Sequence, residues 1–292
     1  MRIFLTGGTG FTGRNLLEQM QNRYEILAPR HKELELLDED AVRRFIKGNK
    51  IDVVIHAAIK PLHRNAKDTT DLVKDNIRMF FNITRNSVYF KKMIYISSGS
   101  VYDMRYYQSK MKEEYFDVHV PCDDTGLYKY AVAKYIEKTD NIVELRPFGL
   151  FGKYEDYAIR FISNMICKAI FDLPLTMHQN CRIDYLYIDD LSQVVEYFIE
   201  HDGRYKAYNV TPDDSIELYQ LAKLVLKISG KNLPIVVAKE GMGLEYSGDN
   251  SRLRQEIPGL TFKPIKQAVK ELYDWYLTNR QMIDKNVLLV DK

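Results

Sequence analysis

Short apolar runs alternate with amphipathic stretches through the first half of the chain. The apolar runs are rich in β-branched residues, which is typical of buried strands, and they lie at residues 2–6, 24–28, 52–57, 93–97 and 141–145. The amphipathic stretches have the helical period, and they lie at residues 13–21, 38–47, 71–90 and 128–138. This alternation predicts an α/β fold with a Rossmann-like, doubly wound parallel sheet.

The regular alternation ends near residue 150. Beyond it we predict a helix at 161–171, a strand and helix within 184–202 whose helix is capped by Asp189 or Asp190, a strand at 206–210, and mainly helices from residue 215. Two lobes are therefore expected, with a cleft above the sheet. Residues 1–150 and roughly 184–212 would form the dinucleotide-binding lobe, and residues 151–183 and 213–292 a smaller, mostly helical substrate lobe.

Charge and cysteine content exclude several classes of protein. The chain has 42 basic and 40 acidic residues, a formal net charge of +2 and no basic stripe, so no nucleic-acid partner is expected. Its three cysteines, Cys122, Cys167 and Cys181, are odd in number and widely spaced, which disfavours a disulfide framework and a metal site. Without a leader or a run of about 18 apolar residues, we expect a soluble cytoplasmic protein that makes no membrane contact.

A glycine-rich turn, TGGTGFTG at residues 6–13, directly follows the first predicted strand and opens the first predicted helix. Gly7, Gly10 and Gly13 have the GxxGxxG spacing. Without Cβ atoms, these residues let the backbone approach a pyrophosphate, whose charge the free N–H groups of the helix N-terminus would hold. The position between strand and helix predicts dinucleotide binding.

The end of the second predicted strand indicates which dinucleotide is bound. An NAD site places an acidic residue there, whereas this chain has Arg30, His31 and Lys32 after Ala28 and Pro29. A cation pairs with a 2′-phosphate, so NADP is favoured over NAD. Three basic residues on a solvated loop are the equally weighted alternative, and NAD therefore stays open.

Hydroxyl groups gather where the fourth predicted strand ends, at Ser97, Ser98 and Ser100. Open α/β sheets bind ligands at this end of their strands. A tyrosine four residues before a lysine occurs at 106/110, 130/134 and 219/223, and only the pair Tyr130 and Lys134 lies on the helix that returns directly to the fifth strand. This pair is the one we expect beside the serines, because residues four apart share a helix face.

Together these motifs resemble the extended short-chain dehydrogenase/reductase family, specifically its NAD-dependent epimerase/dehydratase branch that acts on nucleotide sugars. The similarity spans nearly the whole chain and is carried by TGGTGFTG, HAA (56–58), Asn76, SSGSVY (97–102), YAVAK (130–134), LRPFGLFG (145–152), DYLYIDDL (184–191) and YNV (208–210). Residues 30–58 are most similar to the 4-keto sugar reductases, which include GDP-fucose synthase and dTDP-4-dehydrorhamnose reductase.

The resemblance implies a role for each matched residue. Ser98 would hydrogen-bond the substrate oxygen, Tyr130 would give or take its proton, and Lys134 would favour the phenolate and hold the nicotinamide ribose. The cofactor contacts it implies are Gly7, Thr9, Gly10, Phe11, Thr12, Gly13, Arg30, His31, Glu35, Leu36, Ala57, Ala58, Asn76, Ser97, Tyr130, Lys134, Pro147 and Phe148. The implied substrate contacts are Ser98, Ser100, Tyr130 and Arg182.

Departures from the family pattern narrow the reaction. Gly99 and Ser100 occupy the positions where dehydratases of the family have an Asp-Glu pair, so elimination of water is disfavoured. Ser100 also occupies the position where GDP-fucose synthase has a cysteine, so double epimerisation is disfavoured. Phe148 replaces the usual asparagine after Arg-Pro. Only 16 positions separate Tyr130 from Arg146, so the helix that carries Tyr130 must be short. The family builds its homodimer interface from this helix, and we therefore expect an altered interface.

The sequence therefore predicts an NADP-linked enzyme that reduces a 4-keto group on a nucleotide-activated sugar, with 4-epimerisation as the alternative reaction. A protein of another class, a non-catalytic dinucleotide-binding sensor or scaffold, is the second hypothesis. His56 follows an apolar run and is interpreted as a packed core residue rather than a catalytic group.

Overall fold

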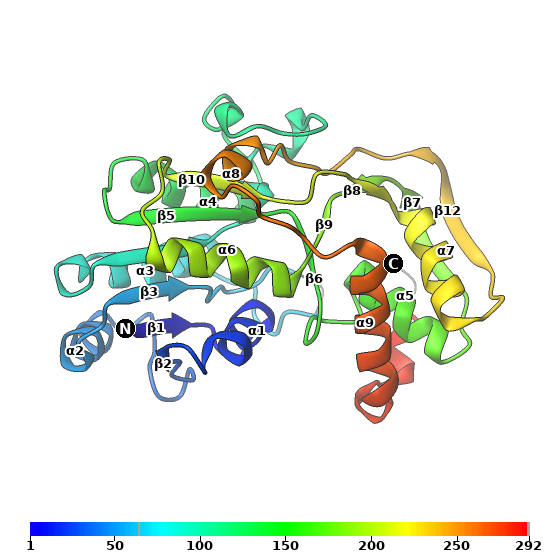
Figure 1. Ribbon diagram of the computed structural model, residues 1–292, viewed down its shortest axis with the longest axis horizontal. Helices are drawn as coiled ribbons and strands as arrows, with labels where there is room; N and C mark the ends of the chain where they lie inside the picture. Colours follow the sequence, from blue (N-terminus) through cyan, green and yellow to red (C-terminus); the bar gives the residue numbers. More distant parts are fainter. Residues whose placement is uncertain (64, 291–292) are drawn as a thin grey trace.

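The centre of the computed structural model, which describes residues 1–63 and 65–290, is a six-stranded parallel sheet (Figure 1). Its strand order is β10-β5-β4-β3-β1-β2, with bounds Ala207–Val210, Ile142–Pro147, Lys92–Ile96, Val53–His56, Arg2–Thr6 and Glu25–Leu27. The order reverses direction beside β1, so two crossovers diverge there and leave room for a ligand above the strand ends. The predicted α/β fold with a doubly wound parallel sheet is confirmed.

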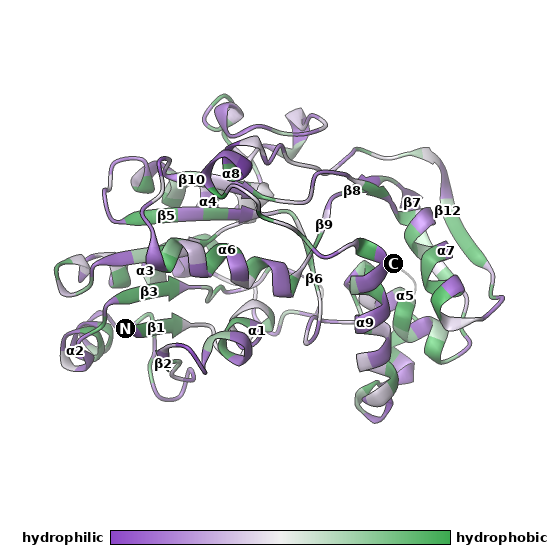
Figure 2. Ribbon diagram, viewed as in Figure 1, coloured by the Kyte–Doolittle hydropathy of each residue, from purple (hydrophilic) through white to green (hydrophobic). Residues whose placement is uncertain are grey.

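Helices cover both faces of the sheet. One face carries α1 (Phe11–Met20) and α6 (Ile188–Glu200), which contact each other, and the other carries α2 (Glu39–Asn49), α3 (Leu72–Thr84) and α4 (Asp124–Ile136) (Figure 1). In Figure 2 the sheet strands are mostly coloured as hydrophobic while the helices carry both colours. Burial on both sides explains why the strand runs are continuously apolar.

A second group of elements lies at the other end of the molecule (Figure 1). Its helices are α5 (Phe161–Ile170), α7 (Leu218–Ser229) and α9 (Ile265–Thr278), and a parallel pair, β7 (Leu175–Asn180) with β12 (Ile235–Met242), flanks them. The two lobe ranges predicted above remain a prediction. This end of the molecule also contains the β7–β12 strands, which the sequence analysis did not identify. Most of Ile235–Met242 is exposed and only Ile235 and Val237 are half-buried, which weakens the apolar signal.

Short elements complete the chain. They are β6 (Gly149–Phe151) paired with β9 (Tyr185–Tyr187), β8 (Arg182–Ile183) paired with β11 (Ile216–Glu217), α8 (Ser251–Glu256), and the 3₁₀ turns Ser87–Tyr89, Gly99–Val101, Met104–Tyr106, Glu113–Tyr115, Arg280–Met282 and Lys285–Leu288. The segment 184–212 thus returns from the β6–β9 pair to the main sheet as β10.

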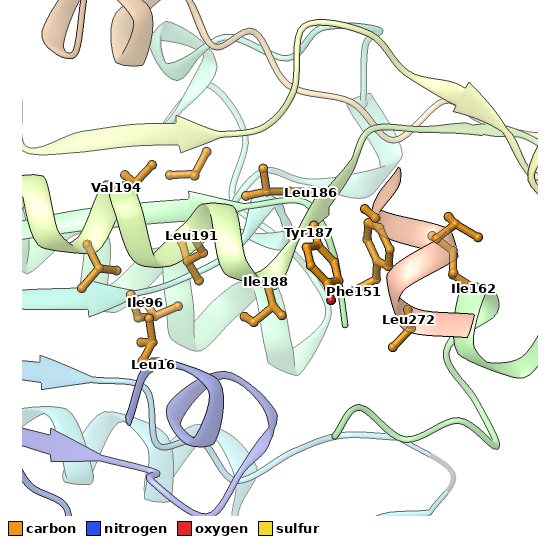
Figure 3. Close-up of a cluster of buried hydrophobic side chains, with 14 of the residues drawn as sticks. Leu16, Ile96, Phe151, Ile162, Leu186, Tyr187, Ile188, Leu191, Val194 and Leu272 are labelled. Carbon is orange, nitrogen blue, oxygen red and sulfur yellow. The ribbon is translucent and has the colours of Figure 1, made fainter. Parts of the chain in front are cut away.

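One apolar cluster continues from the sheet to the second group of helices (Figure 3). Ile188, Leu191 and Val194 of α6 lie with Leu16 and Ile96 on one side of this cluster. Tyr187 and Phe151 extend it toward the second end, where Ile162 of α5 and Leu272 of α9 continue it. Because interiors are close-packed, this shared core fixes where the strand ends lie relative to the second group of elements.

Helix boundaries differ from the sequence analysis at the place that matters most for function. Helix α4 begins at Asp124, four residues before the predicted start, because the Asp123 side chain accepts a hydrogen bond from the Gly126 N–H and caps the helix. Helix α3 ends at Thr84, earlier than predicted. Helix α6 has Tyr187 at its N-cap, so Asp189 and Asp190 lie in its first turn rather than capping it.

The polar segment 103–123 leaves the sheet after β4 and returns at α4. It is held against the sheet edge by Glu113, whose carboxylate accepts the Asn209 N–H of β10 at 2.8 Å, and by Met111, which exchanges backbone hydrogen bonds with Ser247 and Asp249. This excursion therefore lies over the carboxyl ends of β5 and β10, beside the predicted site.

Candidate active site

The glycine turn has the geometry of a phosphate cradle. Gly7 has a φ of +73°, and a Cβ there would lie 2.8 Å from the Ala58 nitrogen; a Cβ on Gly13 would collide with the Gly7 carbonyl. Gly10 precedes α1 as its N-cap, and no side chain caps this helix and no acidic residue lies in its first turn. The first N–H groups of α1 are therefore available to an anion.

A cavity of about 470 Å³ opens beside this turn. Its lining comes from four segments. They are the end of β1 with Gly7, Gly8 and Thr9; the segment after β2 with Pro29, His31 and Leu34–Leu37; the segment after β3 with Ala58–Lys60 and Asp68; and α3 with Asp75 and Met79. Ser98, Tyr130 and Lys134 are not among its lining residues. The cavity thus has the size and position of a binding site for one half of a dinucleotide.

The charges at the end of β2 are partly neutralised within the chain. His31 Nε2 lies 3.1 Å from Glu35 Oε2, and both residues line the cavity. The exposed Arg30 donates its backbone N–H to Glu33 and is not part of the lining. Of the two basic side chains Arg30 and His31 that follow β2, only His31 lines the cavity.

The floor of the cavity is fixed by two polar side chains. The Thr6 hydroxyl accepts the N–H groups of Ala57 and Ala58 and pairs with His56 Nδ1 at 2.7 Å. His56 is 2% exposed and its burial lowers its pKa to about 3, so it is a neutral core residue. Asn76 holds the segment after β3 by pairing with the N–H and carbonyl of Lys60.

The serines after β4 form a compact hydroxyl cluster. The Ser98 and Ser100 hydroxyls lie 2.6 Å apart, and Ser98 also accepts the Ser100 N–H. The Ser97 hydroxyl is buried and has no hydrogen-bond partner among the described residues. The cluster therefore lies where the sequence analysis expected it, with one hydroxyl unpaired.

Tyr130 and Lys134 share one flank of α4, and both contact Asp117 of the excursion. The Tyr130 hydroxyl donates to Asp117 Oδ1, and Lys134 Nζ lies 2.8 Å from Asp117 Oδ2 and 2.8 Å from Glu137. The Asp117 carboxylate raises the pKa of Tyr130, and Asp117 and Glu137 raise the pKa of Lys134. Among the described residues no hydrogen bond joins Tyr130 to Ser98.

Lys129 lies on a different face of the same helix. It is 5% exposed, together with the buried Val132, Ala133 and Ile136 that face the sheet, and its burial lowers its pKa to about 8. Glu144 of β5 is the charge that acts on it, in the raising direction. Neither an ion pair nor a hydrogen bond of the Lys129 ammonium occurs within the described part of the chain.

A buried ionic network lies below this face of α4. Arg146 is 2% exposed, donates to Glu144 Oε2 through two nitrogens at 2.7 and 3.0 Å, and donates to the Tyr102 hydroxyl at 3.0 Å. Tyr102 in turn donates to Asn209 of β10. The other oxygen of Glu144, Oε1, has no partner in the described residues.

Comparison with known proteins assigns the family. A model of the NAD dependent epimerase/dehydratase family matches residues 3–211. The chain belongs to this family. A GDP-L-colitose synthase from Yersinia pseudotuberculosis is 23% identical over 259 residues, covering 79% of this chain and 82% of the relative.

Solved structures agree on the fold. A GDP-mannoheptose C4 reductase from Campylobacter jejuni with NADP bound has a TM-score of 0.81 at 22% identity, covering 94% of this chain and 98% of that one. A GDP-L-fucose synthetase from Naegleria fowleri bound to NADP has a TM-score of 0.83 at 20% identity, covering 97% and 95%.

Within this epimerase/dehydratase fold the remaining predicted site residues are placed as follows. Phe148, 8% exposed, packs against Tyr107 and Tyr246, and Pro147 ends β5. Arg182 donates to the side chain and carbonyl of Ser215 at 3.0 and 2.6 Å, so it is tied to β11. The site roles of these residues stay predictions.

The sequence analysis did not single out Asp117, whose carboxylate contacts both Tyr130 and Lys134. No local pattern indicates this contact, because it depends on how the excursion folds back onto α4. Residues 1–63 and 65–290 contain no group of three or more His, Cys, Asp or Glu side chains that could hold a metal ion. No helix in the same residues is long and apolar enough to cross a membrane.

Proposed function

We propose that the protein is an NADP-linked reductase that converts a 4-keto group of a nucleotide-activated sugar to a hydroxyl. The observation that carries this proposal is the cavity over the glycine turn, whose lining joins the turn that precedes α1 to His31 and the segment after β3. Family membership supports it, as do the two NADP-containing structures of similar fold.

The residues present fit a bound NADP. Gly7 and Gly13 leave the space that a Cβ would fill, the N–H groups of α1 meet the pyrophosphate charge, and His31 with Arg30 would meet the 2′-phosphate. When bound, the reduced cofactor supplies a hydride equivalent. The protein's part is to orient the ring and to stabilise the carbonyl oxygen.

The hydroxyl cluster fits a sugar carbonyl. Ser98 and Ser100 are already paired with each other, so one of them has a proton free to donate to a ligand oxygen. The relatives named above act on GDP-linked sugars, which places GDP first among the nucleotides to test. Arg182 would contact the diphosphate only after exchanging its Ser215 contacts.

Reduction also requires a proton at the carbonyl oxygen, and Tyr130 of α4 would supply it. Tyr130 keeps its proton because Asp117 raises its pKa. Replacement by Tyr130→Phe is therefore expected to lower kcat, because the phenol that would donate the proton is removed.

The test is to mix the protein with NADPH and a panel of GDP-, dTDP-, UDP- and CDP-linked 4-keto sugars and to follow NADPH absorbance. Stoichiometric NADPH oxidation with one of them is the expected result. Interconversion of unmodified nucleotide hexoses without net oxidation would indicate a 4-epimerase instead. NADPH binding without either reaction would indicate the sensor or scaffold.

A matched pair of variants tests the cradle independently of the sugar. Gly13→Ala forces a Cβ against the Gly7 carbonyl, which we expect to weaken NADPH binding by about tenfold to 100-fold. Gly48→Ala in α2 has nothing within 4 Å of its new Cβ, so it should leave binding unchanged. Equal NADPH affinity in the two variants would place the cofactor elsewhere.

A further inference from the structure

One carboxylate holds both polar groups on the outer flank of α4. Asp117 Oδ1 accepts the proton of the Tyr130 hydroxyl, and Asp117 Oδ2 lies 2.8 Å from Lys134 Nζ. A carboxylate has two acceptor oxygens, and here each of them faces a different donor. The hydroxyl and the ammonium therefore converge on one place, where they bind two oxygens of a single planar group.

The start of α4 puts this place beside the serine cluster. A Cβ on Gly126 would lie 2.9 Å from the Ser100 carbonyl oxygen, so the first turn of the helix is pressed against the cluster. Tyr130 follows Gly126 by four residues and shares its face of the helix. A ligand that contacts the serines consequently meets the flank of α4 that Asp117 covers.

The backbone before Asp117 is anchored. The Glu113 carboxylate accepts the Asn209 N–H of β10 at 2.8 Å, and the Phe116 ring lies 5.4 Å from the Tyr130 ring. Asp117 itself has a φ of +70°, in the left-handed region that glycine, asparagine and aspartate adopt more readily than other residues. These constraints fix the position from which the Asp117 side chain reaches α4.

The contacts of the Asp117 carboxylate are exposed to solvent. The side chain of Asp117 is 43% exposed and that of Lys134 is 37% exposed. Exposed ion pairs contribute little to stability, so they are readily exchanged for other partners. Rotation of the Asp117 side chain into solvent would release both donors without moving the anchored backbone. Asp117 is thus placed to hold the two donors until a ligand supplies better acceptors.

We infer that Asp117 is an autoinhibitory latch, whose carboxylate occupies the Tyr130 hydroxyl and the Lys134 ammonium until oxygens of the dinucleotide ribose and of the sugar replace it. This inference rests on the proposed function, in which Tyr130 supplies a proton to the sugar, and on the ribose contact of Lys134 that the family resemblance implies. A protein whose binding-competent form is only partly populated binds its ligand more weakly by that fraction, so the latch lowers the apparent affinity for NADPH. The raised pKa of Tyr130 agrees with a phenol that a carboxylate holds.

Glu137 provides a matched control, because it contacts only one of the two donors. Its carboxylate lies 2.8 Å from Lys134 Nζ, the same distance as Asp117 Oδ2. It belongs to α4 itself and makes no hydrogen bond with Tyr130 within the described residues. Glu137→Gln therefore removes the same negative charge beside the same ammonium and leaves the latch in place. A general repulsion between these carboxylates and an anionic cofactor would affect both positions alike.

The test measures NADPH affinity by isothermal titration calorimetry, without any sugar, in the wild type and in Asp117→Asn, Asp117→Gly and Glu137→Gln. Asparagine and glycine both tolerate the positive φ, so the two Asp117 variants keep the backbone in place. We expect both to bind NADPH about threefold to tenfold more tightly than the wild type, the range of one hydrogen-bonded contact. Glu137→Gln should bind NADPH as the wild type does.

A second background tests whether the latch acts through Lys134. In Lys134→Met the ammonium for which Asp117 and the ribose compete is absent, so addition of Asp117→Asn should no longer raise the affinity. A gain of the same size in this background would mean that Asp117 only repels the cofactor, and it would overturn the inference. Unchanged or weaker NADPH binding by Asp117→Asn and Asp117→Gly would also overturn it, while the proposed function would stand. Absence of NADPH binding by the wild type would overturn both.

Discussion

The two faces of α4 differ in how their charges are satisfied. On the outer flank, Tyr130, Lys134, Glu137 and Asp117 pair with one another in contact with solvent. On the sheet-facing side, Lys129 lies above Glu144 with an ammonium that has no acceptor in the described residues. Exposed ion pairs contribute little to stability, whereas burial of an ammonium is costly because the group loses its hydration.

The comparison shows that spacing alone does not identify a site. Tyr130 with Lys134 and Thr125 with Lys129 have the same four-residue spacing, and both pairs lie on one helix. What distinguishes them is the phase of the helix relative to the sheet, because a shift of five residues turns a side chain by about 140°. The direction of the sheet, marked by Val132, Ala133 and Ile136, decides which of the two lysines is buried.

The largest effect should come from removing the buried carboxylate. Glu144→Gln leaves Arg146, which is 2% exposed, without its ionic partner, so we expect the free energy of unfolding to fall by about 3–5 kcal/mol. The matched change on the outer flank, Glu137→Gln, should cause no measurable loss, because that pair is exposed. Urea denaturation of both variants measures the difference, and equal losses would contradict the contrast drawn between the two faces.

The main sheet could be predicted from the sequence because its strands are continuously apolar. The glycine turn and helices with a clear helical period of apolar residues separate these strands. All six strands of the main sheet were predicted within a few residues. The β7–β12 pair was missed because most residues of β12 are exposed. Nothing local in the sequence indicates that Ile235 pairs with Leu175 sixty residues earlier, since this register depends on tertiary packing.

The site was only partly predictable. The glycine turn and the serines lie where the strand ends place them, because both motifs are local. The contact of Asp117 with Tyr130 and Lys134 depends on how the excursion folds back, and Asp117 adopts a φ of +70° that the sequence does not indicate. The burial of Lys129 depends on which face of α4 packs against the sheet.

An effect of intermediate size should appear as a pH dependence. The pKa of Lys129 falls from 10.5 to about 8 on folding, so between these values the unfolded chain binds more protons and stability rises with pH. The stability advantage of Lys129→Met over the wild type should therefore be fully present below pH 8 and shrink by about 3 kcal/mol as the pH approaches 10.5.

Lys134 gives the opposite sign and serves as the control. Its pKa is raised by Asp117 and Glu137, so its contribution is present below its unfolded pKa and is lost only as pH rises through the higher folded value. The stability difference between the wild type and Lys134→Met should accordingly stay constant from pH 8 to pH 10. Chemical denaturation at several pH values measures both variants, and a flat profile for Lys129→Met would show that Lys129 is solvated.

The smallest expected effect lies at Asp117, whose carboxylate contacts both Tyr130 and Lys134. Asp117→Asn tolerates the positive φ and removes the carboxylate, so the pKa of Tyr130 should fall toward that of free tyrosine, a direction that Lys134 reinforces. Tyrosine titration by NMR, with Tyr130→Phe to assign the signal, measures this shift, and an unchanged titration would contradict the contact. Tighter NADPH binding by Asp117→Asn would mean that the carboxylate competes with the ligand for Tyr130 and Lys134, and unchanged binding would mean that it does not.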